Sequence, residues 1–181
     1  MRYSWICGLL LALGIASAGQ GIAQERPQQS ELPMTYERLG GILFAIDPEL
    51  QPEGLGFQLK ISDVPVLVFT DPAADRMRAM VRIGPADALD EETQMRLLQA
   101  NFDAVLDARY AVASGQIWSV FIHPLSPLET RELVSGLAQT INAARSFGTA
   151  FSGGGIQFGG GDSSALQQEL LDELTKKGVP L

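Results

Sequence analysis

The chain has 181 residues, and 13 Lys and Arg stand against 21 Asp and Glu, which gives a formal net charge of −8. An acidic surface repels phosphate backbones and anionic lipid headgroups, so this balance argues against binding to nucleic acid or to an anionic membrane. Cys7 is the one cysteine, so the chain forms no internal disulfide, and its own hydrophobic core must hold the fold.

The first 23 residues have the order of a secretory signal peptide. A basic start at Arg2 is followed by an apolar run from Trp5 to Ile15 and then by small residues. Both Ala16–Ala18 and Gly21–Ala23 fit a small-x-small cleavage site. The apolar run has about 11 residues, whereas a helix that spans a bilayer needs about 20. We therefore expect cleavage, with an uncleaved membrane anchor as the alternative.

Changes in composition predict five segments. They are a signal peptide (1–23), a flexible leader (24–34), an α+β domain (35–148), a glycine-rich linker (149–162) and a C-terminal amphipathic helix (163–181). Cleavage after Ala23 also removes Cys7, so the mature chain has no thiol chemistry. We expect an exported, soluble product without an integral membrane segment, periplasmic in a Gram-negative cell and otherwise secreted.

The first half of the domain predicts one helix and then three strands. Apolar residues at spacings of three and four indicate a helix from Thr35, a suitable N-cap, to Asp47. Residues 57–61 and 76–83 alternate between apolar and polar, as strands with one wet face do. Residues 64–70 are apolar throughout, which suits a strand central to the sheet. Short loops between the three predict hairpins.

The second half predicts a helix, a hairpin and two further helices. The second helix opens at Asp90, and its apolar stripe is Met95, Leu98, Phe102, Val105 and Leu106. Strands at 110–113 and 116–123 are joined by a two-residue turn. A capping box at 126–129 predicts that the third helix begins at Ser126. Gly148 can end that helix, and leucines of residues 163–181 form the stripe of the last one.

This element order, together with the stretch Leu97–Phe102 (Leu-Leu-Gln-Ala-Asn-Phe), resembles the type III secretion chaperone superfamily, which includes the class I (CesT-like) chaperones and the YbjN-like proteins. The resemblance covers Thr35–Gly148. It implies an α-β-β-β-α-β-β-α fold with an antiparallel sheet, and an acidic homodimer that binds an extended peptide. The signal peptide departs from the family, whose class I members work in the cytoplasm. Asn101 lies beside the apolar stripe, either at a dimer interface or as an ordinary exposed residue.

Two groups of residues are candidates for binding a protein or peptide partner. Three arginines project from one face of a strand, which suits an acidic peptide or a carboxylate ligand. Apolar side chains in the glycine-rich linker would each gain about 1.5–3 kcal/mol on burial, which favours docking onto the domain or a partner. A solvated face and a flexible linker are the alternatives. The predicted partner-binding residues are Arg76, Arg78, Arg82, Phe151, Ile156 and Phe158.

His123 is the only histidine. A catalytic role would require a serine and a carboxylate beside it, and the chain has no Gly-x-Ser-x-Gly elbow. We therefore expect a histidine that is hydrogen-bonded locally at the end of a strand. A single histidine without cysteine does not make a zinc or copper site, and the acidic cluster 87–92 lacks the glycine-centred loop of an EF-hand. No catalytic residue, metal or cofactor is expected.

The leading hypothesis is an exported, chaperone-like protein-binding module without catalytic activity, which acts on an unidentified protein or peptide and has the option of forming a homodimer. The alternative is an exported hydrolase or small-ligand-binding protein that uses His123 and nearby carboxylates. A pocket that joins His123 to an acid and a serine would favour the alternative. A shallow apolar groove or a self-complementary patch would favour the binding module.

Overall fold

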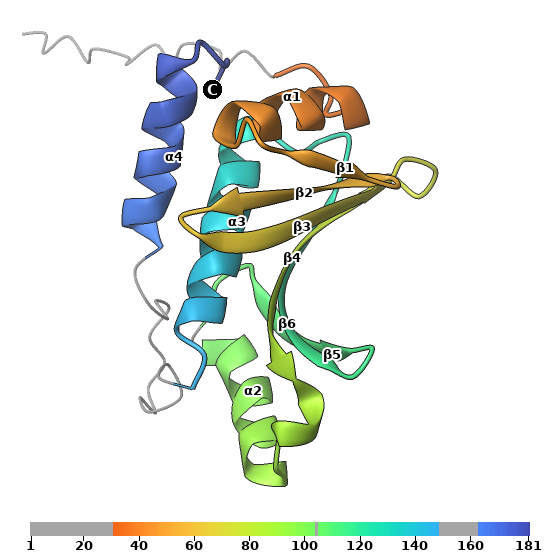
Figure 1. Ribbon diagram of the computed structural model, residues 1–181, viewed down its shortest axis with the longest axis vertical. Helices are drawn as coiled ribbons and strands as arrows, with labels where there is room; N and C mark the ends of the chain where they lie inside the picture. Colours follow the sequence, from red (N-terminus) through yellow and green to blue (C-terminus); the bar gives the residue numbers. More distant parts are fainter. Residues whose placement is uncertain (1–30, 104, 149–162) are drawn as a thin grey trace, which may run out of the picture. The chain divides into compact units, whose positions relative to one another are not determined.

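The computed structural model of the chain describes residues 31–103, 105–148 and 163–181. These residues all belong to the unit Glu31–Leu181 (Figure 1). The elements in chain order are α1 (Tyr36–Ile46), β1 (Gln51–Glu53), β2 (Gly56–Ile61), β3 (Val64–Asp71), β4 (Arg76–Pro85), a 3-10 turn η1 (Ala86–Ala88), α2 (Glu91–Asp103), β5 (Arg109–Ala113), β6 (Gln116–Pro124), α3 (Thr130–Arg145) and α4 (Ser164–Lys176).

All six strands form one antiparallel sheet in the order β1-β2-β3-β4-β6-β5. The predicted α+β class and the order of helices and strands are confirmed. The structure adds β1, which the sequence did not predict because its three residues include Pro52 and all three are exposed. Helix α2 separates β4 from the β5–β6 hairpin, so β6 returns beside β4 and β5 becomes an edge strand.

Two of the hairpins turn on residues with positive φ. Ser62 and Asp63 join β2 to β3 with φ of 47° and 65°, and Ser114 and Gly115 join β5 to β6 with φ of 51° and 69°. Positive φ at both central positions matches the right-handed twist of the flanking strands, as in type I′ turns. The hairpins are therefore set by local backbone geometry, and the hairpin predicted at Ser114 is confirmed.

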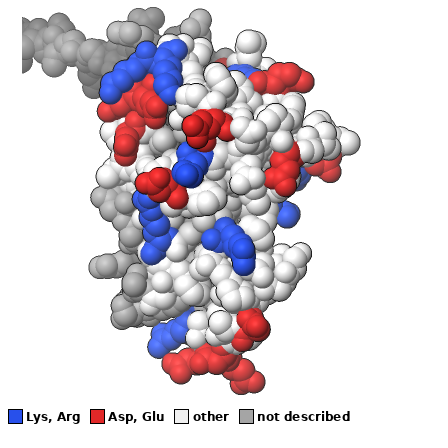
Figure 2. Space-filling model, in the orientation of Figure 1, with Lys and Arg blue, Asp and Glu red and all other residues white. Residues whose placement is uncertain are grey.

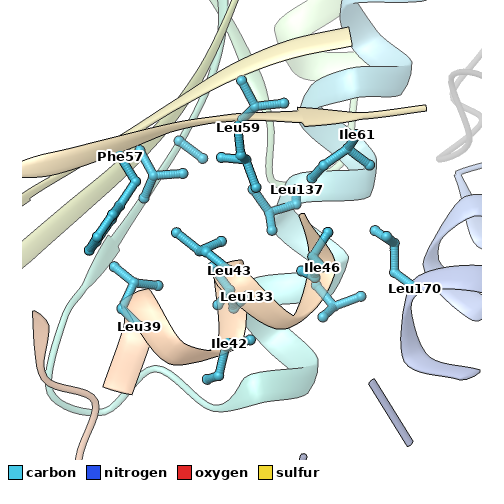
Figure 3. Packing of buried hydrophobic residues seen from close by; sticks show 14 of the residues in the cluster. Leu39, Ile42, Leu43, Ile46, Phe57, Leu59, Ile61, Leu133, Leu137 and Leu170 are labelled. Atoms are coloured by element: carbon cyan, nitrogen blue, oxygen red, sulfur yellow. The ribbon is translucent and has the colours of Figure 1, made fainter. Parts of the chain in front are cut away.

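The main core fills the space between one face of the sheet and the helices α1, α3 and α4. Strand residues that point to this face include Leu59, Val68 and Ala79, all of which are buried. Figure 3 shows leucines and isoleucines of α1 meeting those of β2 and α3. The residues labelled there are Leu39, Ile42, Leu43, Ile46, Phe57, Leu59, Ile61, Leu133, Leu137 and Leu170. The spacing that predicted the first helix therefore identified its buried face correctly.

Helix α3 begins later than the sequence predicted. Glu129 is its N-cap, and the capping box joins Glu129 to Glu132, whose carboxylate accepts from the Glu129 N–H at 3.0 Å. Ser126 instead binds the loop before β4, since its N–H and hydroxyl donate to the two carboxylate oxygens of Asp75 at 2.7 and 2.8 Å. The contact with Asp75 uses the groups of Ser126 that would have capped the helix, so the cap predicted at Ser126 is wrong.

Glu31 holds the start of the described chain against the beginning of α3. Its carboxylate accepts from the N–H and the hydroxyl of Thr130, at 3.0 and 2.7 Å, and it pairs with Arg38 of α1. Burial raises the pKa of Glu31, but the hydrogen bonds from Thr130 and Arg38 outweigh it and hold the pKa below 4.5, its usual value. Glu31 thus satisfies a first-turn N–H of α3 that the helix itself leaves unpaired.

Helix α4 packs on α3 and α1 through the leucines that the sequence predicted. Leu170, Leu171 and Leu174 are buried, and Lys177 after the helix donates to the carbonyl oxygen of Ala45 in α1. Among the described residues, no helix has both the length and the apolar character needed to cross a membrane.

Candidate functional site: an apolar helix surface and an open sheet face

Helix α2 faces the opposite way from the prediction. Leu97 and Ala100 are buried, in a small cluster with Tyr110 of β5 and Ala143 of α3. Val105 of the predicted stripe, just after the helix, is buried as expected. Met95, Leu98 and Phe102 of the same stripe are instead exposed by 56, 63 and 79%. The sequence carries two apolar stripes on this helix, and the narrower one is buried because it fits against β5.

The exposed stripe continues into β5. Leu106 and Val112 are also exposed, and a groove of about 440 Å³ between α2 and β5 is lined by Leu98, Tyr110 and Val112, among others. We call these side chains the α2 surface: Met95, Leu98, Phe102, Leu106 and Val112. Figure 2 shows acidic side chains gathered at the end of the molecule where α2 lies. An exposed apolar area beside charged residues is typical of a protein–protein contact.

Asn101 closes part of the β5 edge from within the same molecule. Its side-chain oxygen accepts from the N–H of Tyr110 at 2.7 Å, and its side-chain nitrogen donates to the carbonyl oxygen of Tyr110 at 3.0 Å. Asn101 is therefore not an ordinary exposed residue, and its place at a dimer interface stays a prediction. The Tyr110 hydroxyl donates to the carbonyl oxygen of Ala143 at 2.8 Å, and burial raises the pKa of that hydroxyl.

The other edge of the sheet is also protected. Strand β1 covers only part of β2, and beyond it the carboxylate of Asp47 accepts from the N–H of Lys60 at 2.7 Å. A side chain thus occupies the place where a further strand would pair with Lys60. Asp47 and Asn101 thus each occupy part of an edge, which disfavours strand addition at Lys60 and at Tyr110.

The sheet face opposite the main core is left open by the helices of the described region (Figure 1). Strand register places two rows of apolar side chains on it: Leu67, Met80 and Val120 in one row, and Phe69 and Ile122 in the next. Ile122 is 52% exposed. We call this surface the open face.

Four arginines surround those apolar rows. Arg76, Arg78 and Arg82 are exposed on β4, as predicted from the alternation, and Arg109 of β5 lies opposite Val120. The sequence did not single out Arg109 because only the pairing of β5 with β6 brings it to this face. A hollow of about 460 Å³ at one end has Phe69, Arg76, Arg78 and Ile122 among its lining residues.

His123 lies on the core face of the sheet, where it is paired with the buried Met77 of β4. Its ring nitrogen Nδ1 is 2.8 Å from the carbonyl oxygen of Pro124, and the ring stacks on Phe121. This agrees with the predicted local hydrogen bond at the end of a strand. A hollow of about 450 Å³ beside His123 is also lined by Asp107, Glu132 and Ser135.

Among the described residues, no hydrogen bond links the polar side chains around that hollow to the imidazole of His123. Asp107 and Ser135 both accept from the side-chain nitrogen of Gln139, at 3.2 and 3.0 Å. Glu132 is bonded within the α3 capping box. Asp107, Ser135 and His123 therefore line the same hollow, but they do not form the series of hydrogen bonds that activates a serine nucleophile.

Within the described ranges, no three His, Cys, Asp or Glu side chains are grouped closely enough to hold a metal ion. The predicted partner-binding residues Phe151, Ile156 and Phe158 lie outside the described residues. Of the six predicted residues, the structure therefore locates the three arginines, which stand together on the open face.

No protein-family model matches the chain, and no curated protein matches it. Solved structures do. The Yersinia pestis type III secretion chaperone SycH, in complex with a stable fragment of YscM2, is 15% identical; the match covers 62% of this chain and 99% of that one, with a TM-score of 0.47. The HopA1–SchA chaperone–effector complex contains a chain that is 16% identical, with 60% and 91% covered and a TM-score of 0.46. The similarity to both is one of fold.

Proposed function

We propose that this chain is an exported protein-binding module with a chaperone-like role, which holds a segment of another polypeptide without reacting with it. The α2 surface supports the claim of a protein contact, and the open face is the surface left for the segment. Of the nine large hydrophobic side chains that are exposed in the described part of the chain, five lie between Met95 and Val112. A concentration of this kind is stabilised by contact with a second protein surface.

We assign the α2 surface to contact with a second copy of the chain. Met95, Leu98 and Phe102 repeat at helical spacing on one side of α2, which suits the packing of two equivalent helices across a two-fold axis. Burial of a large apolar side chain contributes about 1.5–3 kcal/mol. Five such side chains from each copy can outweigh an association cost of about 4–15 kcal/mol.

Light scattering after size exclusion tests the assignment on the mature chain, residues 24–181. We expect a dimer that Leu98→Asp together with Phe102→Asp converts to a monomer, because the substitutions place charges in the contact. Arg96→Asp, on an exposed position on another side of the same helix, is the control and leaves the dimer intact. A wild-type monomer at millimolar concentration would contradict the assignment.

Binding to a permanently unfolded polypeptide tests the function itself. Fluorescently labelled lactalbumin, reduced and carboxymethylated so that it cannot refold, is the probe, and native lactalbumin is the control. We expect the mature chain to raise the anisotropy of the unfolded form only. Equal binding to both forms, or to neither, would contradict a chaperone-like role.

Export is proposed from the leader sequence alone and is tested separately. Expression of the whole chain and of residues 24–181, followed by cell fractionation and mass determination, distinguishes the outcomes. We expect the whole chain to appear outside the cytoplasm with its mass reduced by the leader. Retention of residues 1–23 in a membrane fraction would instead show an anchor.

A further inference from the structure

The open face is basic in a chain that is otherwise acidic. Five of the 13 Lys and Arg residues lie on it, the four arginines and Lys60 of β2, although the chain carries a net charge of −8. The two ion pairs of the described residues are Arg38–Glu31 and Lys177–Glu173, and neither involves this face. Its positive charges are therefore not neutralised by direct pairing within the described fold.

The hydrogen bonds of these arginines are to neutral groups. Arg82 donates from Nε to the side-chain oxygen of Gln116 at 2.7 Å, and Arg76 donates to the carbonyl oxygen of Asp75 at 3.1 Å. Arg109 donates to the carbonyl oxygens of Leu106 and Ala108. Such contacts orient the guanidinium groups, and their positive charge stays available to an anion.

Acidic residues near the face stand at its margins. Asp71 lies directly opposite Arg76 in the pairing of β3 with β4, and Glu53 lies on the edge strand in the row of Phe69. Asp107 lines the neighbouring hollow together with Arg109. Arg78 and Arg82, on either side of Met80, have no acidic residue directly opposite them, since their partners on β6 are Ile122 and Trp118.

We propose that the open face binds an extended, acidic segment of a partner polypeptide in which the residues on one side of the strand are in turn acidic and apolar. Same-side residues of an extended chain are about 6.6–6.8 Å apart, the same repeat that sets Arg78, Met80 and Arg82 along one side of β4. Carboxylates of the segment pair with Arg78 and Arg82, and an apolar side chain enters the hollow over Phe69 and Ile122. This inference names the partner chemistry and rests on the proposed protein-binding function.

The apolar rows distinguish a peptide from other anions. Leu67, Met80 and Ile122 lie between the arginines, where a phosphate polymer or a lipid headgroup would leave them uncovered. The net negative charge of the whole chain also repels a large polyanion, whereas a short segment is attracted where the arginines are grouped.

Three labelled peptides of ten residues test the proposal on the mature chain by fluorescence anisotropy. Each repeats the unit Xaa-Ser-Val-Ser, so that Xaa and Val share one side of the extended chain, and Xaa is Glu, Gln or Lys. We expect the Glu peptide to bind at least about tenfold more tightly than the Gln peptide, and its affinity to fall as salt is added. The Lys peptide should not bind. Equal affinity for the Glu and Gln peptides overturns the proposal.

Charge reversal locates the site. Arg78→Glu together with Arg82→Glu should lower the affinity for the Glu peptide at least about tenfold and create affinity for the Lys peptide. Arg96→Glu, which makes the same change on an exposed position of α2, is the matched control and should leave the Glu peptide bound. Circular dichroism confirms that each variant is folded, and an unchanged affinity in the double variant overturns the proposal.

The outcomes separate this inference from the proposed function. If the mature chain binds unfolded lactalbumin but not the Glu peptide, the protein-binding function stands and the acidic segment is wrong. The pair Leu98→Asp and Phe102→Asp should abolish the dimer and leave the peptide affinity unchanged. Tighter binding of phosphatidylglycerol vesicles or of a short RNA than of the Glu peptide assigns the arginines to phosphate and overturns the proposal.

Discussion

The side chain of Asn101 in α2 makes two hydrogen bonds with the backbone of Tyr110 in β5. Its oxygen accepts from the Tyr110 N–H at 2.7 Å, and its nitrogen donates to the Tyr110 carbonyl oxygen at 3.0 Å. The primary amide thereby takes the place that a neighbouring strand would occupy. It joins the helix that carries the exposed apolar stripe to the edge of the sheet, and so it sets the orientation of α2. The same contact leaves Met95, Leu98 and Phe102 facing outward.

Replacing Asn101 with Ala removes both of its hydrogen bonds to the Tyr110 backbone. We expect the free energy of unfolding to fall by about 1–3 kcal/mol, from about 0.5–1.5 kcal/mol for each bond. Urea denaturation measures the loss. Gln99→Ala, at an exposed position two residues earlier, is the control and should change stability by less than about 0.5 kcal/mol. A loss of the same size in both variants would mean that the amide pair is not responsible.

Leu97 and Leu98 are adjacent in the sequence, but 6 and 63% of their surfaces are exposed. Leu97→Ala should lower the free energy of unfolding of the monomer by about 2–5 kcal/mol, because it leaves a cavity beside β5. Leu98→Ala should change the stability of the monomer by less than about 0.5 kcal/mol and weaken the dimer. Urea denaturation at low protein concentration measures the stability of each variant, and light scattering measures its dimer. A larger loss of stability in Leu98→Ala than in Leu97→Ala would mean that α2 buries Leu98, as the sequence predicted.

Stability should decline in acid, in part through Glu31. Because the folded-state pKa of Glu31 lies below its usual value of 4.5, its contribution is present above that value and is lost as the pH falls through the lower, folded-state pKa. Glu31→Gln should destabilise the protein at pH 7 by about 0.5–2 kcal/mol, as loss of a helix-start acceptor does. The difference between wild type and variant should shrink by pH 3 in urea denaturation curves.

Hydrogen bonds from Ser126 also lower the pKa of Asp75, so some acid sensitivity persists in the Glu31→Gln variant. The difference between the two proteins, rather than either curve alone, reports on Glu31. A difference that stays constant from pH 7 to pH 3 would show that the carboxylate charge of Glu31 is not involved.

Gly136 of α3 lies directly against the ring of Phe121. A Cβ at this position would be 2.5 Å from two ring atoms, so Gly136→Ala should lower the free energy of unfolding by about 1–3 kcal/mol despite the better helix propensity of alanine. Gly41→Ala in α1 meets no atom within 4 Å and should stabilise the protein by up to about 1 kcal/mol. Thermal melting compares the two, and a stabilised Gly136→Ala protein would contradict the close contact.

Leu174 tests whether α4 belongs to the core. It is fully buried, so Leu174→Ala should lower the free energy of unfolding by about 2–5 kcal/mol. Lys176→Ala, two residues later and exposed, is the control. Equal stability of the two variants in urea would mean that the last helix contributes little to the fold.

Local features of the chain were predictable from the sequence. The helix α1, the alternation of β4 and the hairpin at Ser114 each depend on residues close in the chain, through helical spacing, period-two burial and positive φ. The exposed positions of Arg76, Arg78 and Arg82 follow from the same alternation, which is why they were found without the structure.

The surfaces that the proposals use required the tertiary structure. Helix α2 carries apolar residues on two sides, and helical periodicity does not say which side a neighbouring strand will cover. Arg109 joins the other arginines only because β5 pairs with β6, and Ser126 loses the N-cap position to Glu129 because it binds Asp75. In each case the deciding partner is distant in the sequence, so composition and spacing carry no information about it. Local rules set the elements, and long-range packing set which side chains were left for a partner.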